Sequence, residues 1–63
     1  MIEIMIECWV NRDGSTDHIW SLWQSGKRIQ IGNKHGSAED AESEALAFCR
    51  QTFQIEPDRI SRL

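Results

Sequence analysis

The chain has 63 residues, of which 40% are hydrophobic and 27% charged, and its formal net charge is −3. A chain this short buries only about 60% of the surface exposed when unfolded, so we expect one domain, residues 1–63. The acidic balance excludes a general attraction to nucleic acid or anionic lipid. Two cysteines are too few for a disulfide scaffold, and neither a signal peptide nor a membrane-length apolar run is evident. We therefore expect a cytoplasmic protein, and its compactness suggests a protein of bacterial type.

Residues 2–10 alternate between two sets of side chains, which predicts a β-strand with one buried face. Glu3, Met5, Glu7 and Trp9 would point away from the core. The predicted inner face consists of Ile2, Ile4, Ile6, Cys8 and Val10.

The turn after this strand decides which face of the second strand is buried, because a shift of one residue reverses every side chain. A two-residue loop, residues 13–14, would bury Trp23. A three-residue loop, residues 12–14, with its glycine in the left-handed conformation, would instead pair Ile6 with Trp20. We favour the three-residue loop, because it agrees with the next turn.

A third strand over residues 27–32 follows a two-residue Ser-Gly loop. In this register Leu22 faces Ile29 and Trp20 faces Ile31, and the four side chains continue the apolar layer of the first strand. The two hairpins together predict a three-stranded antiparallel meander.

Ser37 and Asp40 form a capping-box pattern, which predicts that a helix begins there. Pro57 ends this helix near residues 54–55. Residues 58–63 allow either a short helical turn or a fourth edge strand. The expected fold is α+β, a β-β-β-α unit with the helix on one sheet face and a short C-terminal tail. The helical stripe facing the sheet comprises Ala38, Ala41, Ala45, Leu46, Phe48, Cys49, Thr52 and Phe53.

The other sheet face would show two tryptophans with no element left to cover them, and exposed apolar patches often mark contact surfaces. Glu3, Trp23 and Arg28 are expected to form a row across the three strands. In the competing interpretation, the tail covers both Trp9 and Trp23, and Arg28 stacks on Trp23. Homodimerisation through this face is a third alternative.

No catalytic, cofactor or metal signature is recognisable in the sequence. Cys8 and Cys49 are expected to be buried free thiols facing each other across the sheet and helix. His18 and His35 lack ligand-spaced companions and are expected to be ordinary histidines. The acidic run of the helix is interpreted as a solvated face made of Glu39, Asp40, Glu42 and Glu44.

The segment KRIQIGNKHGSAEDAESEALAF, with the strand order before it, resembles the three-stranded DNA-binding domains of the AP2/ERF type and of tyrosine-recombinase arm-binding domains. That resemblance implies that Arg and Trp side chains of the sheet enter the major groove of DNA. The second and third strands with the helix also resemble the second half of a double-stranded RNA-binding domain. In that family the helix begins with lysines, whereas this sequence has SAEDAES.

We expect a non-enzymatic binding or accessory protein whose open sheet face contacts another protein or a second copy of the chain. The alternative is a nucleic-acid-binding module in which basic side chains and Gln30 make the contacts while the tryptophans stack, which the acidic net charge disfavours. The candidate binding residues are Trp9, Trp23, Lys27, Arg28, Gln30 and Lys34.

Overall fold

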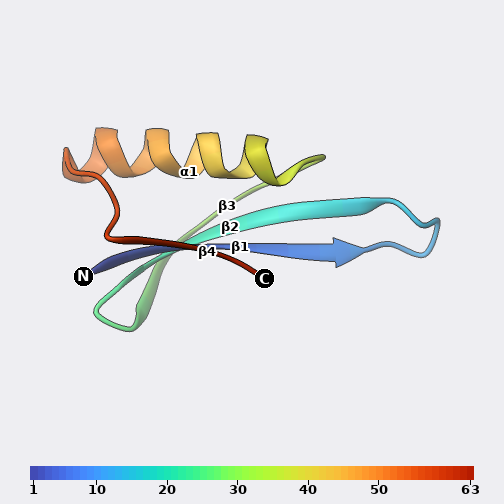
Figure 1. Cartoon of the computed structure of the whole chain (residues 1–63), viewed down its shortest axis with the longest axis horizontal. Coiled ribbons are helices and arrows are strands. Elements are labelled where there is room, and N and C mark those ends of the chain that lie inside the picture. The colour runs from blue at the N-terminus through green and yellow to red at the C-terminus, as the bar shows by residue number, and fades with distance from the viewer.

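The computed structural model describes all 63 residues, as one four-stranded sheet with a helix on one face (Figure 1). The elements are β1 (Ile2–Val10), β2 (Thr16–Gln24), β3 (Lys27–His35), α1 (Ala38–Phe53) and β4 (Arg59–Arg62). The strand order is β3-β2-β1-β4. Strand β2 pairs antiparallel with both β1 and β3, and β4 pairs parallel with β1. The α+β class and the meander are confirmed, and the fourth strand makes the sheet mixed.

The first hairpin has the register predicted from a three-residue loop. Ile6 pairs with Trp20, and Ile4 pairs with Leu22. Gly14 adopts the left-handed conformation that this loop requires, with φ of 89°. The side chains of β1 and β2 therefore point to the predicted faces, but Val10, expected on the inner face, is 75% exposed.

The second hairpin departs from the predicted register because β3 is irregular at two places. The first irregularity shifts the pairing by one residue, so Gln30 rather than Ile29 lies opposite Leu22, and Ile31 lies opposite Ser21. A bulge of this kind reverses the alternation beyond it. The prediction that Ile29 and Ile31 are core residues is wrong, since they are 42% and 49% exposed.

Trp20 explains why an isoleucine does not fill the inner layer of β3. A Cβ atom added to Gly32 would fall on the indole ring of Trp20, so the ring occupies the space that a side chain there would need. Glycine permits this close approach because it has no Cβ. The prediction that the third strand ends at Gly32 is wrong, since β3 continues to His35.

Helix α1 has the predicted ends. The side chain of Ser37 accepts a hydrogen bond from the backbone N–H of Asp40, and Gln54 closes the helix in the left-handed conformation. Trp20 contacts Phe48 with 5.4 Å between ring centroids. The helix covers the isoleucine face as expected, and the buried core is Ile2, Ile4, Ile6, Trp20, Leu22, Ala41, Ala45 and Cys49.

The C-terminal segment forms an edge strand, the second of the two predicted alternatives. Backbone and side chain of Asp58 both bond to Ile2: its N–H donates to the Ile2 carbonyl (2.8 Å), and its Oδ2 accepts from the Ile2 N–H (2.7 Å). The N–H of Leu63 donates to the carbonyl of Ile6 at 2.8 Å. These bonds hold the tail beside β1, so it does not lie across the sheet face as the competing interpretation required.

Cys8 is exposed, which corrects the expectation that both cysteines are buried. The 16 residues of α1 span about 24 Å, whereas the nine-residue strand β1 spans about 30 Å. The hairpin of β1 and β2 accordingly extends beyond the helix (Figure 1). Cys49 is buried, as predicted, and both thiols are free.

No helix of the structure has both the length and the apolar composition that a membrane crossing would need.

Candidate functional site

The sheet face opposite α1, called here the open face, consists of four rows of side chains running across the strands. The predicted row of Glu3, Trp23 and Arg28 is present, and β4 extends it with Arg59. In order along β1, the rows are Arg59, Glu3, Trp23 and Arg28; then Ser61, Met5, Ser21 and Ile31; then Glu7, Ile19 and Lys34; and finally Trp9 and Asp17.

The two tryptophans of the open face differ in exposure. Trp23 is partly buried, and its indole N–H donates to the hydroxyl of Ser21 at 2.9 Å. This contact explains why Ser21 is only 8% exposed although no other element covers the face. Trp9 is 55% exposed. Trp9 is therefore the large aromatic side chain most available to a partner. The indole N–H of Trp23 already has a hydrogen-bond acceptor within the sheet.

Charges on the open face are paired at one place only. Glu3 Oε2 accepts a hydrogen bond from the Ser61 hydroxyl (2.9 Å) and lies 3.5 Å from Arg59 Nε. Arg28 and Lys34 make no salt bridge within the chain. The unpaired basic groups of this face are thus available to an outside partner.

The six candidate residues do not all meet on this face. Trp9, Trp23, Arg28 and Lys34 lie on it, each opposite another member of the rows. The bulge in β3 moves Gln30 to the helix side, where it lines a groove. Lys27 lies beside the β2–β3 turn, opposite Gln24. The structure therefore separates Gln30 and Lys27 from the other four.

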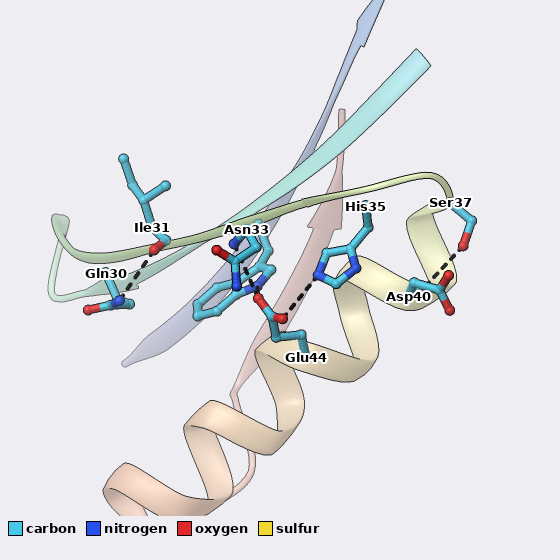
Figure 2. Close-up of polar contacts among 8 residues, drawn as sticks. Gln30, Ile31, Asn33, His35, Ser37, Asp40 and Glu44 are labelled. Atoms are coloured by element: carbon cyan, nitrogen blue, oxygen red, sulfur yellow. Dashed lines mark hydrogen bonds and ion pairs between the residues drawn. The ribbon is translucent and has the colours of Figure 1, made fainter. Parts of the chain in front are cut away.

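A groove with a volume of about 340 Å³ lies between β3 and α1, apart from the open face. Figure 2 shows the side chain of Glu44 reaching from the helix toward this strand, with Asn33 and His35 beside it. The groove is lined by Trp20, Gln30, Ile31, Gly32, Asn33, Glu44, Ala47, Phe48 and Gln51.

Glu44 is a structural acceptor, which corrects its interpretation as part of a solvated face. Its Oε1 accepts hydrogen bonds from the indole N–H of Trp20 (2.7 Å) and the backbone N–H of Asn33 (3.2 Å). Its Oε2 lies 3.2 Å from Nε2 of His35. These donors, the Trp20 indole foremost, lower the pKa of Glu44 from 4.5 to about 2.

The position of Glu44 in the sequence contained a usable signal. It lies three residues after Ala41 and four before Phe48, both on the stripe that faces the sheet, so it borders that stripe. A buried tryptophan also needs an acceptor for its indole N–H. Taken together, these two facts point to a bond between the helix and Trp20.

The groove offers little for acid–base chemistry. A carboxyl with a pKa of about 2 stays ionised near neutral pH and exchanges protons poorly there. No group of three or more His, Cys, Asp or Glu side chains is arranged to hold a metal ion. The open face is therefore the stronger candidate site.

Comparison with known proteins gave no match to a family model, to a curated protein or to a solved structure.

Proposed function

We propose that this chain is a non-enzymatic interaction protein that binds another polypeptide through its open face. The observation that supports this proposal most is that Trp9 is 55% exposed. Helix α1 covers the opposite face of the sheet and β4 lies at its edge, so neither element covers this tryptophan. Tryptophan is prominent among the residues that dominate binding energy at protein interfaces. A tryptophan with more than half of its surface open to solvent is well suited to that purpose.

The composition of the open face favours a polypeptide partner. Its second row contains no charged residue, and most of its charged groups lie in the first and fourth rows, although the third row holds Glu7 and Lys34. Protein interfaces have this general arrangement of an apolar centre and a polar rim. The apolar and aromatic members are Met5, Trp9, Ile19, Trp23 and Ile31.

Charge on the open face argues against a nucleic-acid partner. The face carries three basic groups, Arg28, Lys34 and Arg59, against three acidic groups, Glu3, Glu7 and Asp17. Their formal charges cancel, so the face supplies no net attraction to phosphate, which provides most of the affinity in non-specific nucleic-acid binding. A protein surface of mixed charge is the better complement.

We expect the protein to work in the cytoplasm, because an exposed free thiol such as Cys8 persists in a reducing compartment.

Photo-crosslinking in the cells that express the chain tests the proposal. Benzoylphenylalanine would replace Trp9 in one variant and Ile19 in another, both on the open face, and exposed Ser43 of α1 in a control. We expect irradiation to give a discrete protein adduct from the open-face variants and none from the control. Adducts from the control alone, or none from either open-face position, would contradict the proposal.

A further inference from the structure

We propose that the outer edge of β3 binds an extended, acidic segment of the partner protein, which places its acidic side chains beside the open face and apolar side chains in the groove. This inference rests on the proposed function, since it names the form and the charge of the polypeptide bound at the β3 margin of the open face. Three features of one strand support it: a free edge, unpaired basic side chains and the adjoining groove.

Strand β3 is the last strand on its side of the sheet, so no strand pairs with its outer edge. It has nine residues, as do β1 and β2, and none of them is buried. The other edge strand, β4, has only four residues. A long exposed edge strand presents backbone N–H and C=O groups with which an extended peptide can pair.

The backbone groups of β3 differ in how firmly they are already bonded. The carbonyl of Ile31 accepts a hydrogen bond from the side-chain amide of Gln30 at 3.3 Å, in a position exposed to solvent (Figure 2). A backbone N–H of a partner can replace this amide. The N–H of Asn33, in contrast, donates to Glu44. Backbone pairing with a partner is therefore expected over residues 27–31.

Unpaired basic side chains are concentrated on the same strand. Strand β3 carries Lys27, Arg28 and Lys34 and no acidic residue, and all three are exposed. None of them forms a salt bridge within the chain. Apart from Arg12 in the β1–β2 turn, β3 holds every Lys and Arg that lacks a salt bridge.

These charges determine which segment the edge accepts. Basic residues and irregularities on an edge strand commonly prevent pairing with other strands. An acidic segment is the exception, because its carboxylates would be attracted to the unpaired basic groups. Arg28 and Lys34 lie on the open-face side of the sheet, opposite Trp23 and Ile19. The acidic side chains of the partner therefore belong on that side.

The groove receives the other side chains of the segment. Successive side chains of a strand point to opposite faces, so a segment paired with β3 directs every second side chain toward α1. Trp20, Ala47 and Phe48 supply an apolar lining there. Glu44 is ionised at neutral pH and opposes an acidic side chain in the groove. An apolar side chain is the better fit.

The distance between the basic groups sets the spacing of the acidic ones. Arg28 and Lys34 are six positions apart in the sequence, which corresponds to at most about 20 Å along an extended strand. The partner then needs two acidic residues about six positions apart, with apolar residues alternating between them. A single strand buries less surface than a standard interface, so we expect a dissociation constant of roughly 1–100 μM.

Selection from a displayed library of random peptides of about twelve residues tests this inference, since that length spans β3. The full chain is the bait. We expect the enriched peptides to share alternating acidic and apolar residues. In ¹H–¹⁵N spectra, an enriched peptide should shift the amides of Ile29 and Ile31 and leave those of Trp9 and Ser43 nearly unchanged.

Charge reversal tests the electrostatic part. The double variant Arg28→Glu, Lys34→Glu should bind the enriched peptide about tenfold or more weakly, and a peptide with lysines in place of its acidic residues should recover the loss. Arg12→Glu is the matched control, because Arg12 is also exposed and unpaired but lies outside β3. Thermal melting checks that each variant retains the fold.

Filling the groove tests the apolar part. Ala47 is exposed and lines the groove, so Ala47→Trp occupies that space without entering the core and should also weaken binding. Ser43→Trp, at an exposed position of α1 outside the groove, is the control and should leave binding unchanged.

Failure to enrich any peptide, enriched peptides without acidic residues, or equal weakening by Arg12→Glu would overturn this inference. Enriched peptides that shift Trp9 and Ile19 but not β3 would overturn the edge as the site and support the open face. Crosslinking from Trp9 and Ile19 decides the proposed function separately. A protein adduct in cells without an enriched peptide would overturn the acidic segment alone, whereas a peptide bound at β3 without any adduct would restrict the contact to the edge and contradict the wider open face.

Discussion

The carboxylate of Glu44 accepts a hydrogen bond from the indole N–H of Trp20 across 2.7 Å, which joins α1 to the centre of the sheet. The same oxygen accepts the backbone N–H of Asn33, in the part of β3 where its pairing with β2 is irregular. One carboxylate thus accepts hydrogen bonds from the indole of a core tryptophan and from a backbone amide of the edge strand.

Glu44 should make the free energy of unfolding depend on pH. Its folded pKa of about 2 lies below the ordinary 4.5, so its stabilising contribution is complete above pH 4.5 and is lost as the pH falls toward 2. Glu44→Gln should flatten that part of the acid unfolding curve and cost about 1 kcal/mol at neutral pH, since the carboxylate is partly exposed. Glu39→Gln is the control, because its side chain is 77% exposed and its 3.8 Å ion pair with Arg62 is a surface pair that contributes little, so the acid limb should change little. Equal curves for Glu44→Gln and wild type would contradict this role.

Gly32→Ala should destabilise the fold by about 1–3 kcal/mol, because the added Cβ would fall on the Trp20 ring and force it to move. Gly36→Ala is the matched control, since a Cβ there meets nothing within 4 Å. Urea unfolding of the two variants measures the difference. Two alanine variants of equal stability would show that Trp20 does not lie against Gly32.

Trp20→Ala and Trp23→Ala should differ sharply in stability. Trp20 is 2% exposed within the core, and truncating a core aromatic costs about 3–5 kcal/mol, enough to unfold a domain this small. Trp23 lies partly buried on the open face and bonds to Ser21, so its loss should cost less, about 1–2 kcal/mol. Circular dichroism melting compares them, and a larger loss for Trp23→Ala would mean that the faces of β2 are reversed.

The two thiols should react at very different rates with a thiol reagent under native conditions. Cys8 is exposed, whereas Cys49 is buried and burial raises its pKa. We expect one thiol to be labelled rapidly and Cys8→Ser to abolish that fast phase. Rapid labelling that persists in Cys8→Ser would show that Cys49 is accessible.

Elements governed by local signals were predictable from the sequence. The limits of α1 follow from Ser37 and Pro57, and the first hairpin follows from the left-handed Gly14. Both signals act within a few residues, so no knowledge of the packing was needed.

The register of β3 was not predictable, because it depends on a contact between strands. Alternation alone placed Ile29 and Ile31 inside, but the Trp20 ring needs the space over Gly32. Packing decided the register, and it moved Gln30 from the open face to the groove as a consequence.

The candidate site was only partly predictable, because some of its members depend on the bulge in β3 and on the pairing of β4. The row of Glu3, Trp23 and Arg28 lies before the first bulge and therefore kept its predicted pairing. The contribution of Arg59 depended on β4 pairing with β1, which the sequence left open as one of two alternatives. Glu44 was missed because its partner Trp20 is 24 residues away.

The open face is tested most directly by photo-crosslinking in the cells that express the chain, with benzoylphenylalanine at Trp9, at Ile19 and, as the control, at exposed Ser43 of α1. A discrete protein adduct is expected from the two open-face positions and none from Ser43. An adduct from Ser43 alone, or none from either open-face position, would contradict the open face as the contact surface.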